Sequence, residues 1–250
     1  MKTIWTFFLA LIITANLAKA QDSLYVYKAG TILYKQAVTG VDSITFYKDN
    51  HTVTDIDGNV YKTVTIGTQT WMVENLKVTH YRDGSAIPNI TNATTWTSLT
   101  TGAYCDYNNL TSNGLIYGHQ YNWLAAVDTR NIAPIGWHVP TNAEWNLLSD
   151  YLGGATVAGG KLKEAGTTHW ASPNTGATNS SGFTALPGGN RSNINGTFDS
   201  MSTYGRWWST TESSTTSAWT RNLNYYYSNI FTDTGGNAKS IGCSIRCVKD

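Results

Sequence analysis

The sequence predicts an α+β fold, with short helices in the middle of the chain and strands towards both ends. Three observations favour this class. Two helical patterns, at residues 141–154 and 157–165, stand close together near the middle of the 250 residues. Segments of β-forming residues precede and follow them, and long polar loops rich in Asn, Thr, Ser and Gly separate the segments. An α/β protein would instead alternate strands and helices along the whole chain.

Residues 1–20, MKTIWTFFLALIITANLAKA, have the three parts of a secretory signal peptide: a positive start, an apolar run and a closing AKA of small-x-small form. The apolar run covers roughly ten residues, whereas a membrane span needs about 20. We therefore expect export, with no membrane span in the mature chain, to the periplasm, the cell surface or the medium.

N-terminal sequencing of the exported protein is expected to begin at Gln21, because the AKA site ends at Ala20. An intact Met1 recovered from a membrane fraction would contradict this prediction.

Residues 21–50 are predicted as a short β-rich lead segment. β-forming residues mark three short strands, around 24–26, 32–34 and 44–46, separated by turns that contain Gly30 and Gly40. About 30 residues bury little surface alone, so this segment is an appendage of the main domain, which we assign to residues 51–250.

A β-hairpin is predicted where Asp57-Gly58-Asn59 separates residues 52–56 from residues 60–66. The same tract loosely resembles a calcium loop, but it lacks the Glu that such a loop needs at its twelfth position. We therefore interpret the tract as a turn and assign no metal ligand to it.

Three helices are predicted after a loop-rich stretch over residues 80–115. The first covers residues 118–127, and the last covers residues 157–165. Between them, the stretch PTNAEWNLLSDYLGG carries the clearest signal. Thr141 and Glu144 have the capping-box spacing, and apolar residues then recur at helical positions until Gly-Gly ends the pattern. We therefore interpret Glu144 as a structural helix cap and not as a catalytic acid.

Composition excludes several functional classes. Charged residues make up 13% of the chain and aromatic residues 12%, which excludes a disordered chain. The formal net charge is +1, so no basic surplus favours binding to nucleic acid. Phosphate-loop, nucleophile-elbow and zinc-protease motifs are missing, and the five His residues are scattered. We assign no catalytic residue, no metal and no cofactor, and we interpret His138 as structural.

The candidate ligand-binding residues are aromatic side chains within polar surroundings. Consecutive side chains of a strand face opposite ways, so one ring of Trp207-Trp208 is expected to face the core and the other to face solvent. An exposed ring flanked by polar residues could stack on a sugar, whereas the alternative is that these rings fill the core. The candidates are Trp207, Trp208, Trp219, Tyr225, Tyr226 and Tyr227.

The three cysteines leave two alternatives open. Export permits disulfides. Cys243 and Cys247 lie four residues apart in a predicted strand, which places them about 13 Å apart, whereas a disulfide needs Cα atoms within about 7 Å. Any bridge therefore joins Cys105 to one of these two cysteines, and the alternative is three free thiols.

A series of motifs in a fixed order resembles the Fibrobacter succinogenes major paralogous domain over residues 52–250. The series is DIDGNVYKTVTIGTQTWMVENLK, AYCDYNN, YGHQYNWLAA, APIGWHVPTNAEWNLLSDYLGG, GGKLKEAGTTHW, SGFTALPGGNR, RWWSTTE and SIRCVKD. That family is similar to the superfamily of the formylglycine-generating enzyme and the C-type-lectin-like proteins. GWHVPTNAEW resembles the superfamily motif R-L-P-T-x-x-E-W, and SIRCV resembles its G-F-R ending. The resemblance implies a C-type-lectin-like fold with two or three short helices, twisted antiparallel strands, long loops and a terminal strand pair.

The resemblance also bears on the cysteines and on calcium. Cys105 and Cys247 match the family's cysteine positions, so the resemblance implies a disulfide between them and leaves Cys243 as an odd, buried thiol. The formylglycine-generating enzyme needs two nearby redox cysteines before its last strand, and this chain has only Cys105 before Cys243. The E-P-N and W-N-D triads of calcium lectins are missing, so calcium-dependent sugar binding is not implied.

Two functions of different class follow. The favoured function is an exported, non-catalytic binding or surface-interaction module that recognises a glycan or an extracellular polypeptide through its C-terminal aromatic loops. The alternative is an enzyme on a scaffold like the formylglycine-generating enzyme, with an unidentified active site. A cluster of Cys243, a histidine and a carboxylate in an open cleft would favour the enzyme. The family that the chain resembles has no settled activity.

Overall fold

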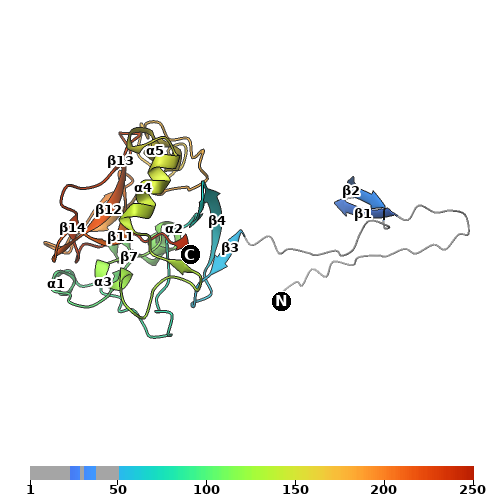
Figure 1. Ribbon diagram of the computed structural model, residues 1–250. Coiled ribbons are helices and arrows are strands. Elements are labelled where there is room, and N and C mark those ends of the chain that lie inside the picture. The colour runs from blue at the N-terminus through green and yellow to red at the C-terminus, as the bar shows by residue number, and fades with distance from the viewer. Residues whose placement is uncertain (1–22, 29–30, 38–50) are drawn as a thin grey trace, which may run out of the picture. The chain divides into compact units, whose positions relative to one another are not determined.

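The computed structural model describes residues 23–28, 31–37 and 51–250, and the chain divides into two units, Met1–Asp49 and Asn50–Asp250. In the first unit, β1 (Ser23–Lys28) pairs antiparallel with β2 (Thr31–Ala37) (Figure 1). Two of the three predicted lead strands are therefore confirmed. The third, around residues 44–46, and the predicted signal peptide lie outside the described residues.

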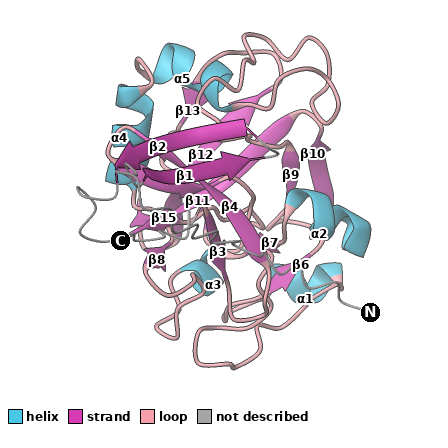
Figure 2. Cartoon of the chain, turned by 90° about the vertical axis from the view of Figure 1, so that its right-hand side faces the viewer, coloured by secondary structure: helices cyan, strands magenta, loops and turns pink. Residues whose placement is uncertain are grey.

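The second unit is an α+β domain with short helices and mostly antiparallel strands (Figure 2). Its strands are β3 (Thr52–Thr54), β4 (Val60–Ile66), β5 (Gln69–Met72), β6 (Tyr104–Cys105), β7 (Gln120–Tyr121), β8 (Trp137–His138), β9 (Gly188–Arg191), β10 (Phe198–Met201), β11 (Tyr204–Glu212), β12 (Ser217–Asn224), β13 (Ile230–Phe231), β14 (Asn237–Ala238) and β15 (Val248–Lys249). Its α-helices are α1 (Ala93–Thr97), α2 (Thr111–Tyr117), α3 (Trp123–Ala126), α4 (Asn142–Tyr151) and α5 (Ala155–Leu162). No helix in the described part of the chain has the length and apolar character of a membrane span.

Two sheets organise this domain. One has the strand order β3-β4-β5-β15-β8, so the last strand of the chain lies beside strands from the start of the domain. The other runs β10-β9-β11-β12-β13, with β14 paired to β12. Helices α4 and α5 lie next to each other on the side of β11, β12 and β13 (Figure 1). Because β15 pairs with β5, both ends of the domain meet in one sheet, as the resemblance implies.

The predicted hairpin is confirmed, since β3 pairs antiparallel with β4. One carboxylate oxygen of Asp55 accepts hydrogen bonds from the amides of Asp57 and Asn59, at 3.0 and 2.9 Å. Its other oxygen accepts from the Tyr61 hydroxyl at 2.6 Å. The Asp55 carboxylate thus fixes the turn, and no group of three His, Cys, Asp or Glu side chains in the described residues is arranged to hold a metal ion.

Helix α4 begins at the predicted capping box. The Thr141 hydroxyl accepts from the Glu144 amide at 3.2 Å, and the Glu144 carboxylate accepts from the Thr141 amide at 2.7 Å. Glu144 also bonds His138 Nε2 at 2.7 Å, while Asp250 bonds His138 Nδ1 at 2.6 Å. The predicted capping-box geometry is confirmed, while the structural role of His138 stays a prediction. The imidazole joins α4 to the end of the chain.

Stability is expected to fall as the pH rises through the pKa of His138. Burial alone lowers this pKa, but the hydrogen bonds to Asp250 and Glu144 raise it overall. Because the folded state then holds the proton more tightly, His138 stabilises the fold below the ordinary histidine pKa of about 6.5 and loses this effect at higher pH. Urea unfolding from pH 5.5 to 8.5 checks this. An unchanged pH slope in His138→Gln would contradict it.

The prediction of one helix over residues 118–127 is wrong in its first half. Gly118 has a φ of +77° and ends α2, Gln120 and Tyr121 form β7, and only Trp123–Ala126 are helical. Helices α1 and α2 lie in the stretch predicted as loop. Helices of a few residues show less than two turns of periodicity, so their pattern is too short to detect.

Helix α5 begins and ends earlier than predicted, and its glycines explain its position. A Cβ atom at Gly159 would lie 2.2 Å from the carbonyl oxygen of Asn229, and one at Gly160 would lie 2.4 Å from the carbonyl oxygen of Gly176. A side chain at Gly159 would push the helix away from the loop between β12 and β13, and one at Gly160 would push it away from the loop that contains Gly176. The two glycines therefore allow α5 to pack against both loops.

Candidate functional site

The structure places Trp207 and Trp208 in the core. They are 1% and 0% exposed, so the prediction that one ring faces solvent is wrong. The side chains do point to opposite sides of β11, but both sides are covered. Trp207 lies in the apolar cluster of Trp145, and Trp208 in that of Tyr121. Rings buried to this extent fill the core and cannot stack on a ligand, as the alternative interpretation stated.

The remaining aromatic candidates are more exposed. Tyr226 and Tyr227 are 57% and 50% exposed, whereas Trp219 and Tyr225 are half-buried. Successive rings meet edge to face, with centroid distances of 5.9 Å for Tyr225–Tyr226, 5.5 Å for Tyr226–Tyr227 and 5.7 Å for Tyr227–Phe231. We call these four rings the aromatic ladder.

A polar groove adjoins the aromatic ladder. It consists of two hollows of about 320 and 460 Å³ that share Tyr204 and Asp233. The smaller hollow is also lined by Asn222, Tyr227 and Phe231, so two rings of the ladder form one wall of the groove. The other groove residues are Asn190, Ser192, Asn193, Asp199, Ser200, Arg206, Asn224, Thr232, Thr234 and Ile241.

Strand register places the polar side chains of the groove on one sheet face. Arg206 lies opposite Asn222 in the pairing of β11 with β12, and Asn222 lies opposite Phe231 in the next pair. Asp199 lies opposite Asn190 in the pairing of β10 with β9. Side chains of directly paired residues share a face, so all five strands of this path contribute to one surface.

Several polar groups of the groove retain free bonding capacity. Arg206 Nε donates to Asn222 Oδ1 at 2.9 Å, but no ion pair joins its guanidinium to another described residue. Asn222 is only 2% exposed, and its Nδ2 has no hydrogen-bond partner among the described residues. Each oxygen of the Asp199 carboxylate accepts one hydrogen bond, from Asn190 Nδ2 at 3.3 Å and from Ser200 Oγ at 2.6 Å. An unpaired buried donor costs free energy, and a bound acceptor would remove that cost.

Lys163 holds the loop that carries the aromatic ladder. Its side chain is 0% exposed, and Nζ donates to the carbonyl oxygens of Thr175, Asn224 and Tyr227 at 3.0, 3.0 and 2.8 Å. Burial lowers the pKa of Lys163 to about 8. Sequence reasoning missed this role, and its only signal was the motif GGKLKEAG. The ammonium ties the end of α5 to the groove wall.

Lys163→Met is expected to lower the free energy of unfolding by about 2–3 kcal/mol, because hydrogen bonds to a charged group contribute about 1.5–3 kcal/mol and buried carbonyls lose their donor. Chemical denaturation checks this. Lys161→Met is the matched control, since Lys161 Nζ contacts one carbonyl oxygen, that of Leu152, at 2.8 Å. Equal losses in the two variants would contradict the role of Lys163.

The expected disulfide between Cys105 and Cys247 is not formed, and all three cysteines are free and buried. Cys105 lies in a small cluster with Trp96 and Ala103, whereas Cys243 and Cys247 lie in a different, larger cluster. The strand Gln120–Tyr121 runs between Cys105 and Cys243 and pairs with both segments. Two strand spacings of about 4.8 Å therefore separate Cys105 from Cys243, beyond the reach of a disulfide, and Cys247 belongs to a different core cluster from Cys105.

Cys243 does not lie in an open cleft. It is 0% exposed, and burial raises the pKa of its thiol to about 12. A thiol in this state is not a nucleophile near neutral pH. An open cleft with Cys243, a histidine and a carboxylate would favour the enzyme alternative, and the buried position of Cys243 does not provide one.

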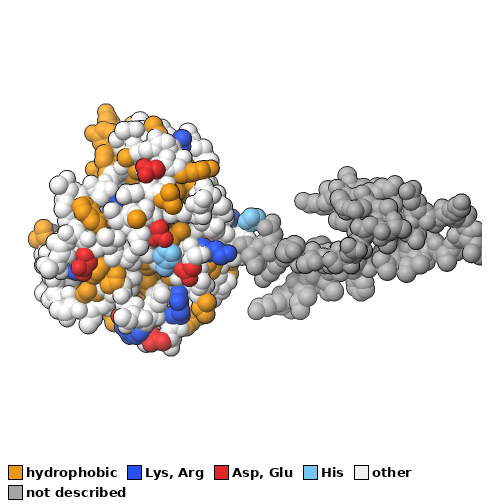
Figure 3. All heavy atoms as spheres, viewed as in Figure 1, with side chains coloured by type: hydrophobic (Ala, Val, Ile, Leu, Met, Phe, Trp, Pro, Cys, Tyr) orange, Lys and Arg blue, Asp and Glu red, His pale blue; other side chains and the backbone are white. Residues whose placement is uncertain are grey.

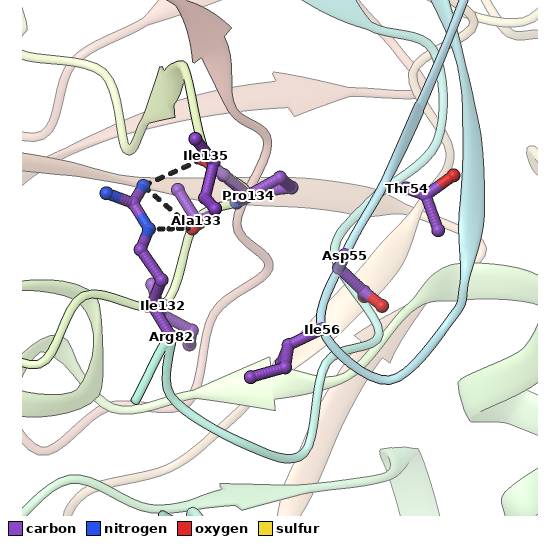
Figure 4. Close-up of a pocket in the computed structure, with 8 residues that line it drawn as sticks. All are labelled: Thr54, Asp55, Ile56, Arg82, Ile132, Ala133, Pro134 and Ile135. Carbon is purple, nitrogen blue, oxygen red and sulfur yellow. Dashed lines mark hydrogen bonds between the residues drawn. The ribbon is translucent and has the colours of Figure 1, made fainter. Parts of the chain in front are cut away.

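Another hollow, of about 200 Å³, lies beside the turn between β3 and β4 (Figure 4). Its wall includes Ile56, Ile132 and Ile135. Arg82 lies at its edge, but its guanidinium donates to the carbonyl oxygens of Ala133 and Pro134. Because Asp55 is also bonded within the turn, this hollow offers few free polar groups. The groove is the better candidate site.

Charge does not concentrate on the face drawn in Figure 3, where acidic and basic side chains are scattered among uncharged ones.

Comparison with known proteins identified a family. A family model described as the Fibrobacter succinogenes major domain matches residues 64–249. No curated protein and no solved structure matches the chain.

Proposed function

The chain belongs to the Fibrobacter succinogenes major domain family, and on this premise we propose that it is an exported, non-catalytic binding module. Family membership by itself assigns no activity. The binding surface in this proposal is the polar groove on the sheet β10-β9-β11-β12-β13, together with the aromatic ladder. The ligand is a polar glycan or an extracellular polypeptide.

One observation carries the proposal. All five strands of the path place side chains on a single open groove, and the buried amide of Asn222 lies there without an acceptor. Ligand sites combine a concave surface with a few placed polar groups and aromatic walls, and this groove has all three. Export is supported by the signal-peptide pattern of residues 1–20.

We further propose that the domain is a divergent C-type-lectin-like fold. Three features support this assignment: the closing strand β15 beside β5, the capped helix α4 that begins within GWHVPTNAEW, and the SIRCV ending that leads into β15. A solved structure of the chain, compared with C-type-lectin-like domains, tests the assignment.

Binding is tested with the mature chain from Gln21 on a glycan array and a panel of extracellular polypeptides. Tyr227→Ala is expected to weaken binding about 30-fold, which corresponds to the hot-spot scale of about 2 kcal/mol. Tyr151→Ala is the control, because Tyr151 is 65% exposed on α4 and does not line the groove. Binding that both variants retain unchanged would contradict the proposed site.

A further inference from the structure

We propose that the groove binds a neutral pyranose unit of a polysaccharide, without a metal ion, through Asn222, Asp233 and Arg206, with the sugar ring against Tyr227 and Phe231. This inference rests on the proposed function and narrows its ligand from polar molecules in general to uncharged sugars.

The first argument is the match of donors and acceptors. Asn222 Oδ1 is occupied by Arg206 Nε, which leaves the Nδ2 donor without a partner. On Asp233, Oδ2 accepts from Thr220 and Asn237, and Oδ1 has no partner among the described residues. A hydroxyl group both accepts and donates. One sugar hydroxyl can therefore donate to the carboxylate, and a neighbouring hydroxyl can accept from the amide once the buried Asn222 side chain turns toward the groove.

The second argument is that the two terminal nitrogens of the Arg206 guanidinium have no hydrogen-bond acceptor among the described residues. Only Nε of Arg206 has a hydrogen-bond acceptor among the described residues. Its two terminal nitrogens form a planar fork that fits two oxygen atoms side by side. Adjacent hydroxyls of a pyranose present two oxygens in this way, so Arg206 can bind the same face of the sugar.

Charge decides between neutral and acidic sugars. Asp199 and Asp233 line the groove, and Arg206 is its one cation. The groove lining therefore carries a formal charge of −1. A uronate or a sulfate would meet two carboxylates in a shared hollow, and like charges so close repel. An uncharged sugar meets no such repulsion.

The place of the groove on the sheet argues against a polypeptide. An extended peptide commonly binds by adding a strand to a sheet edge, where backbone groups are unpaired. The groove instead lies on the sheet face, where β11 is paired on both sides by β9 and β12. Side chains provide the bonding groups there, and the rings of Tyr227 and Phe231 offer an apolar wall to the C–H face of a sugar.

Calorimetry on the mature chain in EDTA tests the inference. The probes are cellohexaose, mannohexaose, xylohexaose, hexagalacturonate and unfolded casein, at one ionic strength. At least one neutral hexasaccharide is expected to bind, and hexagalacturonate is expected to bind at least tenfold more weakly. Arg206→Gln and Tyr227→Ala should each weaken binding of the neutral sugar at least tenfold. Asp233→Asn should reduce the difference in affinity between the neutral hexasaccharide and hexagalacturonate. Asp150→Asn, an exposed carboxylate on α4, should change nothing.

The outcomes separate the two proposals. Tighter binding of hexagalacturonate, or binding of casein alone in a way that Tyr227→Ala abolishes, would overturn the neutral-sugar inference and leave the binding module in place. If a probe binds and every groove variant binds it as tightly as the wild type, the proposed site is wrong as well. Binding of no probe would count against both. Thermal melts of each variant separate lost binding from lost folding, and Tyr227 is exposed enough for its replacement to be tolerated.

Discussion

Trp207→Ala is expected to lower the free energy of unfolding by about 3–5 kcal/mol, the range for removal of a large buried aromatic side chain. The indole is 1% exposed and packs in the cluster of Trp145, with ring centroids 6.5 Å apart. Its Nε1 donates to Asn75 Oδ1 at 2.8 Å. The replacement removes apolar contacts, opens a cavity and deletes this hydrogen bond. Urea denaturation of both proteins measures the difference.

Two comparisons make this prediction specific. Trp219→Ala should lower the free energy of unfolding clearly less than Trp207→Ala, because Trp219 on the neighbouring strand is only half-buried. Trp207→Phe keeps most of the volume and should fall between Trp207→Ala and the wild type. A Trp207→Ala protein that keeps its full stability and loses ligand binding would restore Trp207 as a binding residue.

Arg246→Met is expected to lower the free energy of unfolding by about 3 kcal/mol or more, because several buried hydrogen bonds to a charged group are lost and each contributes about 1.5–3 kcal/mol. The guanidinium is 0% exposed. Its Nε and Nη2 donate to Asn75 Oδ1 at 3.0 and 2.7 Å, and Nη1 donates to the carbonyl oxygen of Phe183. Methionine fills much of the space, but the carbonyl oxygen of Phe183 then loses this donor and Asn75 Oδ1 keeps only the hydrogen bond from Trp207 Nε1. Denaturant unfolding checks the prediction.

A second variant, Arg246→Lys, separates the contribution of the positive charge from that of the planar guanidinium. Burial lowers the pKa of Arg246 to about 9, which reflects the free-energy cost of removing the charged group from water. A lysine at this position would have a similar desolvation cost, and it would lack the planar guanidinium that donates several hydrogen bonds. Arg246→Lys should therefore also destabilise the domain. Arg130→Met is the surface control, since its ion pair with Asp128 is exposed and such pairs contribute about 0–1 kcal/mol. Equal effects of Arg130→Met and Arg246→Met would contradict the prediction.

Arg246 is one of several buried cations with the same role. Arg191 donates to the carbonyl oxygens of Gly196, Ile90 and Thr91, and Lys163 donates to three others. Loops leave many carbonyl groups without a backbone partner, and buried polar groups need one. Long cationic side chains supply several donors each, so they hold the loops of this domain in place.

Features set by neighbouring residues were predictable from the sequence. The capping box of Thr141 and Glu144 and the hairpin at Asp57-Gly58-Asn59 depend on atoms a few residues apart, so their motifs carry the information. The family was predictable too, because its motifs occur in order along the chain. The α+β class followed from where helical and alternating patterns occur.

The candidate site depended on the tertiary structure. Alternation correctly placed Trp207 and Trp208 on opposite sides of β11, but it could not show that core covers both sides. The groove was equally hidden, since β9 and not β10 pairs with β11, and this order brings Asp199, Arg206 and Asn222 onto one face. Local sequence determines which way a side chain points, because that follows from backbone geometry. What covers the side chain depends on contacts between distant segments, and those form only when the whole chain packs.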